Sequence, residues 1–434
     1  MELCIRILEC IAFVTMVLSS LYALYIAFIA LFGFSKAKEI PQTDKKPGST
    51  RFAVLIPARN EEAVIRQNVA SLLKQNYPKE SYRVFVIPNN CTDQTEIAAR
   101  EAGSEILKCE GRITSKGDVL REILPKISAT GAYDAYVVFD ADNRVMPDFL
   151  SEMEKAFLAG FDAAQGFRES GNPSATETSG ACSVYYWLDN YFYTQSRWNL
   201  GGSALINGTG FAFSDACLQR TGGWQTVSLT EDIEYSGILA EVGTRIAWVP
   251  QAVTFDEQPE KFIQAWKQRL RWTVGMYQCV KAHTGKLLSG VGKTGRSTFM
   301  LLDMLFFYLF PATGVLGVTS CVTGIAAAVL SSAVGILPVG KMLLGVISGV
   351  VISFIVMTLV ALAGVLRAGK RVKDTYKGIL GFWFFAVSWA PIAIICLFRK
   401  NQKWDEIKHK NNQEIDKLAL EREKATSAVE RGKP

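Results

Sequence analysis

Two aspartates separated by one residue stand where they could hold a metal ion. Asp140 and Asp142 directly follow a short apolar run that is typical of a β-strand. Carboxylate oxygens suit a hard divalent cation such as Mg²⁺ or Mn²⁺, and they leave its other positions open for phosphate oxygens. An Asp-x-Asp sequence is also ordinary turn chemistry. Its place at the end of a strand, beside other polar strand ends, favours the metal site.

A second acidic sequence, Thr230-Glu231-Asp232, opens a predicted helix. One interpretation is helix capping, because acids are stabilised at the positive end of a helix. The other is general-base catalysis, which needs a proton acceptor within reach of an attacking hydroxyl. The chain has only two histidines, so a carboxylate is the natural base. We predict that Asp232 takes this proton, with Glu231 beside it.

A third cluster lies on a predicted helix. Gln268, Arg271 and Trp272 are spaced i, i+3 and i+4, so they share one helix face. An arginine can hold diphosphate oxygens through bidentate bonds, and a tryptophan gives a sugar ring an apolar platform. The alternative is an amphipathic helix at a membrane surface, with Lys267 and Arg269 meeting lipid headgroups. The two interpretations are compatible.

The elements that must position these residues belong to a predicted α/β domain. Apolar runs at 52–57, 82–87 and 135–139 are typical of buried strands, and 61–75 has the pattern of a helix. This alternation predicts a mostly parallel sheet. Ligands of such sheets bind beyond the carboxyl ends of the strands. The polar clusters at those ends are 60–62, 89–93 and 140–142.

Composition places part of the chain in lipid. Hydrophobic residues make up 49% of the 434 residues, and the mean hydropathy is +0.16, which is high for a purely soluble protein. Nine cysteines without a C-x-x-C pair indicate neither a disulfide framework nor a zinc site. The net charge of +6 is concentrated beside the apolar runs, which favours anionic lipid over nucleic acid as a partner.

Four apolar runs define the expected organisation. We predict a transmembrane anchor at 1–35, a cytosolic domain at 48–285, three or four helices within 286–400 and a charged cytosolic tail at 401–434. Four C-terminal crossings are preferred, because an even number leaves the basic segment 399–410 inside. This requires the run 299–337 to cross twice. Asp303 and Lys341 are expected at the membrane interface, with the border of a polar path as the alternative.

The order and spacing of the three motifs resemble those of membrane-embedded family 2 glycosyltransferases, the group of cellulose, chitin and hyaluronan synthases. The likeness runs from Ala53 to a C-terminal segment, 404–409, that looks like W-x-x-T-x-H with Ile407 in place of threonine. The resemblance implies a GT-A nucleotide-sugar fold with helices in the membrane at both ends. We expect a multi-pass protein of a bacterial plasma membrane.

Carried over to this chain, the resemblance assigns residues to a donor side and an acceptor side. The donor side is Pro57, Ala58, Asn60, Glu61, Asn89, Asp93, Lys116, Asp140 and Ala141, with Asp142 and Asp140 on the metal. The acceptor side is Asn207, Gly208, Thr209, Gly210, Gln268 and Trp272, with Asp232, Glu231 and Arg271 as catalytic residues. One residue departs from the pattern, because Asn89 stands where aspartate is usual. An amide can still bind a uracil edge, but with different donors and no charge.

The resemblance implies an inverting transfer of a hexose from a nucleoside diphosphate sugar, with a UDP-sugar expected. The first choice of acceptor is a growing polysaccharide that is also exported. The alternative is a single transfer to a lipid, since ceramide glucosyltransferases share this motif set. A third possibility is an inactive membrane scaffold. Intact Asp142, Asp232 and Arg271 count against it.

Overall fold

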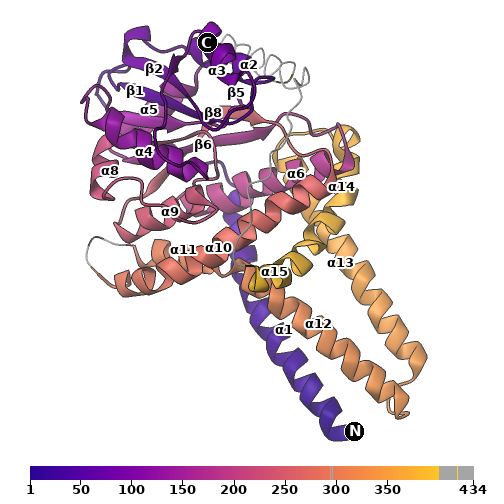
Figure 1. Cartoon of the computed structure of the whole chain (residues 1–434). Helices are drawn as coiled ribbons and strands as arrows, with labels where there is room; N and C mark the ends of the chain where they lie inside the picture. The colour runs from indigo at the N-terminus through magenta and orange to yellow at the C-terminus, as the bar shows by residue number, and fades with distance from the viewer. Residues whose placement is uncertain (294, 296, 400–417, 419–434) are drawn as a thin grey trace, which may run out of the picture.

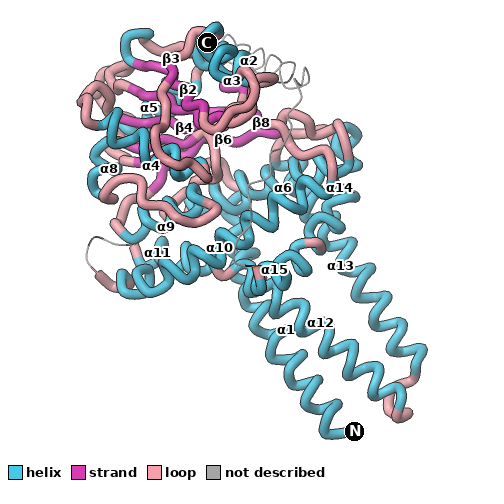
Figure 2. Tube along the Cα trace, viewed as in Figure 1, coloured by secondary structure: helices cyan, strands magenta, loops and turns pink. Residues whose placement is uncertain are grey.

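The computed structural model describes residues 1–293, 295, 297–399 and 418. It has a domain that contains the described strands, and long helices project from this domain, with the N-terminus at their far end (Figures 1 and 2). The predicted tail at 401–434, including the W-x-x-T-x-H-like segment, lies outside the described residues apart from Leu418.

One mixed sheet of eight strands organises the domain, in the order β3-β2-β1-β4-β7-β6-β8-β5. The strands are β1 (Phe52–Ala58), β2 (Tyr82–Pro88), β3 (Glu105–Ile106), β4 (Ala135–Val138), β5 (Arg144–Val145), β6 (Ala163–Ser170), β7 (Phe211–Ser214) and β8 (Ile246–Asp256). The first four in this order are parallel, as predicted. β7 runs antiparallel to both β4 and β6, so the sheet is mixed at its centre.

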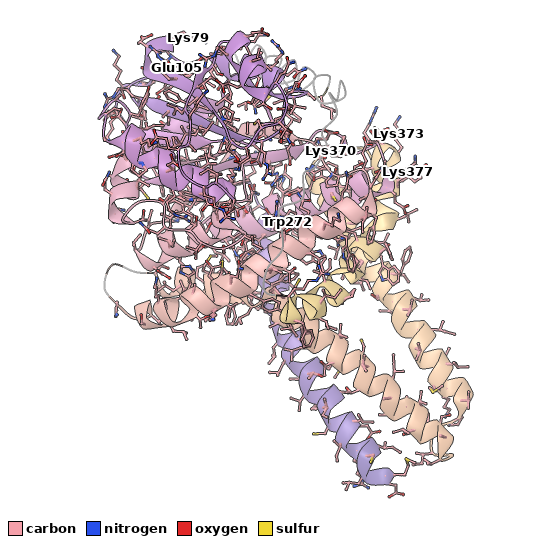
Figure 3. The ribbon with its side chains drawn as sticks, in the orientation of Figure 1. Lys79, Glu105, Trp272, Lys370, Lys373 and Lys377 are labelled. Atoms are coloured by element: carbon pink, nitrogen blue, oxygen red, sulfur yellow. The ribbon has the colours of Figure 1, made fainter. Side chains whose placement is uncertain are left out.

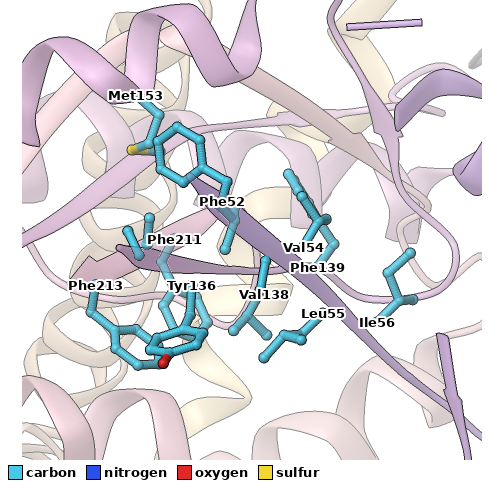
Figure 4. Close-up of a cluster of buried hydrophobic side chains, with 14 of the residues drawn as sticks. Phe52, Val54, Leu55, Ile56, Tyr136, Val138, Phe139, Met153, Phe211 and Phe213 are labelled. Carbon is cyan, nitrogen blue, oxygen red and sulfur yellow. The ribbon is translucent and has the colours of Figure 1, made fainter. Parts of the chain in front are cut away.

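The predicted strands at 52–57, 82–87 and 135–139 correspond to β1, β2 and β4. Val54, Leu55 and Ile56 are fully buried, because helices cover both faces of this part of the sheet. Figure 4 shows them packed with aromatic residues of β4 and β7, including Tyr136 and Phe211. This core fixes the strand ends that border the functional site.

Helices of the domain cover this sheet and continue towards the C-terminal helices. They are α2 (Ile65–Leu73), α3 (Thr95–Glu101), α4 (Lys116–Ser128), α5 (Phe149–Leu158), α6 (Glu177–Leu188), α7 (Ser196–Asn199), α8 (Asp215–Arg220), α9 (Glu231–Glu241) and α10 (Phe262–Gly290). A π-helical segment, Asp189–Gln195, joins α6 to α7. The predicted helix at 61–75 begins only at Ile65, because 59–64 form a turn in which Asn60 has a φ of 57°.

The C-terminal helices are α11 (Thr298–Tyr308), α12 (Phe310–Ala333), α13 (Val339–Arg367), α14 (Val372–Val387) and α15 (Trp389–Phe398). Three helices extend away from the domain as legs: α1 (Glu2–Ala30), α12 and α13 (Figure 1). The turn between α12 and α13 lies at the same far end as the N-terminus. Lys370, Lys373 and Lys377 lie at the opposite end, near the domain (Figure 3).

Four segments are long and apolar enough to cross a membrane: 2–33, 310–333, 339–367 and 372–398. The run 299–337 contains α11 and α12. With 11 residues, α11 is about 16 Å long at 1.5 Å per residue, which is too short for a hydrocarbon core of about 30 Å. By length and composition, this run therefore holds one candidate span, α12, and the two crossings expected in it stay a prediction.

The fourth segment, 372–398, differs from the three legs. It is 39% buried, against 6% for each leg, and it is divided into α14 and α15 at Ser388. α14 packs closely on α6, where a Cβ on Gly378 would lie 2.4 Å from the carbonyl carbon of Gly180. Arg269 of α10 donates to the carbonyl of Phe385 and to Ser388 Oγ, each at 2.7 Å. These bonds hold the break between α14 and α15 against the domain.

Candidate functional site

A cavity of about 1990 Å³ lies beyond the carboxyl ends of β1, β2 and β4 and continues between the legs. Most of the predicted site residues line it. They are Pro57, Ala58, Glu61, Asn89, Lys116, Asp140, Ala141, Asp142, Asn207, Gly208, Glu231, Asp232, Gln268, Arg271 and Trp272. The structure thus brings together residues from both predicted sides of the site, which lie far apart in the sequence.

Asn60 and Asp93 support the turns after β1 and β2 and are not among the lining residues. Asn60 Oδ1 accepts a bond from the Thr92 amide at 2.8 Å. Asp93 accepts bonds from Thr95 and from the Glu62 amide. Burial raises the pKa of Asp93, but the combined effect of these bonds is a larger lowering, so the pKa lies below its usual value. Both residues therefore hold the loops after β1 and β2 together.

Asn89, the residue that departs from the family pattern, has a defined amide orientation. Its Nδ2 lies 3.0 Å from the carbonyl oxygen of Ala58 and 3.5 Å from that of Ile87. Two carbonyl neighbours require the nitrogen of the amide to face them. Oδ1 is consequently the atom of this side chain that remains to accept a bond from a ligand.

Asp140 is held by a lysine at the start of α4. Lys116 Nζ donates to Asp140 Oδ1 at 2.6 Å and to the carbonyl of Gly208 at 2.7 Å. Burial raises the pKa of Asp140, but the charges of Lys116, Arg168 and Arg271 lower it more. Asp140 is therefore ionised and already engaged in an ion pair.

Thr209 and Gly210 support this carboxylate from behind. The Asp140 amide donates to Thr209 Oγ1 at 3.0 Å, and the Gly210 amide donates to the carbonyl of Val138 at 2.9 Å. Gly210 has a φ of 62°, and a Cβ on it would lie 2.9 Å from Thr254. The predicted acceptor loop is thus divided, because Asn207 and Gly208 line the cavity while Thr209 and Gly210 bond the backbone at Asp140 and Val138.

A divalent cation fits this site only if phosphate oxygens of a bound substrate complete its coordination. The described residues contain no group of three or more His, Cys, Asp or Glu side chains that would cage a metal ion. Mg²⁺ and Mn²⁺ are commonly held by one or two carboxylates together with phosphate oxygens of a substrate. Asp142 lines the cavity and suits this mode, whereas Asp140 would have to share its carboxylate with Lys116.

Asp232 lies in the first turn of α9, beside the Asn207–Gly208 turn. A Cβ on Gly208 would lie 3.4 Å from Asp232 Oδ2, so glycine leaves room above this carboxylate. Burial and the charge of Asp140 raise the pKa of Asp232. Burial and the charge of Asp232 raise the pKa of Glu231 to about 7. Both shifts favour proton acceptance near neutral pH.

The capping interpretation is confirmed in part, because Thr230 is the N-cap residue of α9 and the acids Glu231 and Asp232 stand in its first turn. The Thr230 side chain makes no capping bond to the first turn of α9. It packs instead on α10, where a Cβ on Gly275 would lie 2.3 Å from Thr230 Oγ1. Thr230 therefore joins the helix that carries Asp232 to the helix that carries Arg271.

α10 presents two different faces. Gln268, Arg271 and Trp272 line the cavity, as the i, i+3, i+4 spacing predicts. Arg269 points away from it and is only 1% exposed. Burial lowers the pKa of Arg269 to about 10. The expectation that Arg269 meets lipid headgroups is therefore wrong, because its guanidinium is bonded inside the protein.

Three aromatic side chains from separate helices form a platform at the junction between the domain and the legs. Trp272 stacks on Tyr185 of α6 at 6.0 Å and on Trp389 of α15 at 6.3 Å between ring centroids. Figure 3 shows Trp272 at this junction. Sequence reasoning missed Tyr185 and Trp389, although Tyr185 belongs to an aromatic run at 185–187 that could have indicated a site.

Arg168 and Asp189 are further lining residues that the sequence did not single out. Arg168 pairs with Asp256, donates to the carbonyl of Asn207 at 2.8 Å and lies over the ring of Tyr186. Asp189 accepts a bond from Asn207 Nδ2 at 3.3 Å, and burial raises its pKa to about 6. Both residues hold the turn beside Asp232.

The cavity changes character towards the legs. Its walls there come from Tyr22 and Ile26 of α1, Gly314 and Gly317 of α12, and Met357 of α13. Among the described residues, α1, α12 and α13 contribute no charged side chain to this wall. One end of the cavity is thus polar and charged, and the other is apolar and open between helices that could lie in a bilayer.

Comparison with known proteins gives a family and a fold. Residues 47–275 match the model of the glycosyltransferase like family 2, which covers more than half of the chain. A mannosyltransferase from Pyrobaculum calidifontis, solved with GDP-Man and Mn²⁺, superposes with a TM-score of 0.59 at 18% identity, covering 91% of this chain and 98% of that one. This likeness shows that the GT-A fold is shared.

Curated relatives include enzymes with different acceptors. The probable glycosyltransferase YdaM of Bacillus subtilis is 27% identical over 59% of this chain and 61% of its own length. The β-monoglucosyldiacylglycerol synthase of Nostoc is 28% identical over 62% and 58%. The poly-β-1,6-N-acetyl-D-glucosamine synthase of Staphylococcus aureus is 25% identical over 52% and 54%. The chain spans about three fifths of the length of the first two.

Proposed function

Because this chain belongs to the glycosyltransferase like family 2, we propose that it transfers a sugar from a nucleoside diphosphate sugar to the hydroxyl of a membrane lipid. The observation that carries the proposal is the single cavity that joins Asp232 to the apolar wall between α1, α12 and α13. A lipid hydroxyl can reach Asp232 along this cavity while its acyl chains stay in apolar surroundings.

The acceptor class follows from the charge of that wall. An anionic lipid phosphate drawn into the cavity would need an unpaired cation. The described legs offer none in the lining, and Arg168 is already paired with Asp256. The other cations of the cavity, such as Lys116 and Arg271, lie at its polar end beside Asp140. These observations favour an uncharged lipid. The name of the Nostoc relative, a diacylglycerol glycoside synthase, also supports a diglyceride acceptor.

The donor base proposed here is uracil. Uracil presents one imide N–H between two carbonyl oxygens, and Asn89 Oδ1 supplies one acceptor for it. Guanine presents two adjacent donors, for which the two oxygens of a carboxylate are the better match. The amide orientation of Asn89 therefore supports a UDP-sugar, since Nδ2 is bonded to the carbonyl of Ala58.

The proposed chemistry is a single displacement with inversion. Asp232 accepts the proton of the lipid hydroxyl. The hydroxyl oxygen then bonds to the anomeric carbon, while the bond from that carbon to the diphosphate breaks. Arg271 and Lys116 lie on the same cavity and can stabilise the negative charge that develops on the diphosphate. A divalent cation held by Asp142 would neutralise part of that charge.

A growing polysaccharide, the first choice from the sequence, is the second candidate. It is supported by the Staphylococcus relative and by the aromatic platform of Tyr185, Trp272 and Trp389. Export would need a polar path across the bilayer. The three legs are only 6% buried and line the cavity with uncharged residues, which favours a lipid that enters from the side.

The test is the nature of the product. The full chain in liposomes that contain dioleoylglycerol is incubated with labelled UDP-glucose, UDP-galactose or UDP-N-acetylglucosamine and Mg²⁺ or Mn²⁺. We expect a label that partitions into organic solvent as one glycolipid. Label in a high-mass, water-soluble product would support the polysaccharide instead. The Asp232→Asn variant in the same liposomes gives the background.

A further inference from the structure

A buried histidine connects the two helices that carry the site. His283 of α10 places Nδ1 2.7 Å from Glu241 Oε1 and Nε2 3.3 Å from Glu234 Oε1, and both glutamates belong to α9. The side chains of His283 and Glu234 are 4% and 2% exposed. Neither is among the residues that line the cavity. The cluster therefore lies behind the site, where it makes no contact with a substrate in the cavity.

The other oxygen of Glu234 holds a wall of the cavity. Glu234 Oε2 accepts bonds from the amides of Val227 and Ser228, at 2.8 and 2.6 Å. The segment 226–230 lines the cavity and leads directly into Glu231 and Asp232. α10 also holds this segment through Gln278 Oε1, which accepts a bond from the Leu229 amide at 3.0 Å.

The two ring contacts of His283, at 2.7 and 3.3 Å, suit a protonated imidazole. A neutral imidazole has one N–H donor, so it can bond to only one of two carboxylates. An imidazolium donates to both Glu234 and Glu241 and places a positive charge between them. The other titratable groups around the ring are Lys286 and Cys279 of α10 and Tyr308 of α11. Lys286 lies 3.8 Å from Glu241 on the outer side.

We propose that His283 is a positioning residue, which holds Asp232 and the 226–230 wall in register with Arg271 by joining α9 to α10 through Glu234 and Glu241. The chemistry belongs to the transfer reaction proposed above, and His283 touches none of the reacting atoms. Misplacement of catalytic groups by about 1 Å can cost on the order of 100-fold in rate. A bridge that fixes two helices can therefore control turnover from behind the site.

The bridge depends on pH in one direction. Burial lowers the pKa of His283, but hydrogen bonds and charges from Glu234 and Glu241 raise it to about 9. A histidine whose pKa is raised on folding stabilises the folded state fully below its unfolded pKa of about 6.5. This stabilisation is lost as the pH rises through 9. Turnover of the wild type should therefore fall on the alkaline side, near pH 9.

The direct test uses the scarcity of histidine. The chain has two, so His409→Asn leaves His283 as the sole imidazole. Nitrogen-15 NMR of histidine-labelled full chain should show a protonated ring at pH 7.5 that titrates near pH 9. A ring that is neutral at pH 7.5 overturns the proposal. This measurement needs no acceptor, so it stands even if the liposome assay yields no glycolipid and the proposed function fails.

The kinetic test compares His283→Gln with Lys286→Gln, which removes an exposed positive charge from the same helix. We expect His283→Gln to lower kcat roughly 10- to 100-fold and to leave the KM for the nucleotide sugar nearly unchanged. Its pH profile should lack the alkaline limb, which is the fall in kcat near pH 9 expected for the wild type. Lys286→Gln should behave like the wild type. Unchanged kcat with the limb retained in His283→Gln overturns the proposal.

A second variant covers the case in which His283→Gln does not fold. Glu241→Gln removes one of the two carboxylates and leaves the bonds of Glu234 to Val227 and Ser228 in place. The alkaline limb should then move to lower pH, because the imidazolium loses half of its partners. A limb that stays in place contradicts the role of His283.

Discussion

Replacing Asp303 tests how the domain is attached to its legs. Arg197 Nε lies 3.0 and 2.8 Å from the two carboxylate oxygens of Asp303, and Tyr25 of α1 donates to the same carboxylate at 2.5 Å. The side chains of Arg197 and Asp303 are 2% and 10% exposed. Asp303 is thus a buried ion-pair partner, and it is not among the residues that line the cavity.

The magnitude follows from burial. Asp303→Asn leaves the Arg197 guanidinium buried without its counter-charge, and breaking such a pair costs about 3–5 kcal/mol. The carbonyl of asparagine can keep one neutral bond, worth about 1 kcal/mol. A net loss of about 3 kcal/mol corresponds to a fall of roughly 6–12 °C in Tm for a domain of this size.

The assay is thermal unfolding of purified full chain, followed by tryptophan fluorescence. The matched control is the double variant Arg197→Met with Asp303→Leu, which removes both charges and should recover most of the lost Tm. An Asp303→Asn variant with an unchanged Tm but lost transfer would refute this reasoning. Asp303 would then act on a polar path.

Three further predictions concern the base, the cavity and the membrane. Asp232→Asn should lower turnover about 100-fold or more, whereas isothermal titration should show UDP-sugar binding retained. Gly317→Phe fills open space in the cavity wall, so the KM for dioleoylglycerol should rise about tenfold or more, while Gly340→Phe, outside the lining, should leave it unchanged. In a cysteine-free background, a maleimide should label Ile336→Cys from outside and Lys373→Cys only after permeabilisation, because the hairpin turn and the basic segment lie at opposite ends of the legs. Label at both positions from outside would contradict this orientation.

The sequence predicted the sheet and the motifs because their signals are local. A continuous apolar run such as 52–57 indicates a buried strand without further information. Motif spacing placed Gln268, Arg271 and Trp272 on one face, and all three line the cavity. It did not show that Asn60 and Thr209 bond other loops and do not line the cavity, because side-chain direction in a loop depends on bonds to distant segments.

The break between α14 and α15 illustrates the other limit. Hydropathy over 372–398 indicates a membrane span. The sequence does not reveal that Arg269 binds the backbone at Phe385, more than a hundred residues away. The apolar wall of the cavity was not predicted for the same reason, because α1, α12 and α13 contribute uncharged and mostly apolar residues to it, which carry no motif of their own.

The length of the legs has a consequence for the bilayer itself. At about 1.5 Å per residue, the 24 residues of α12 and the 29 of α13 extend about 36 and 44 Å, whereas a hydrocarbon core is about 30 Å thick. Helices longer than the core tilt, and the tilt changes with bilayer thickness. Acyl-chain length therefore sets the depth at which the cavity meets the lipid. Hydrophobic mismatch becomes a control on how easily an acceptor enters.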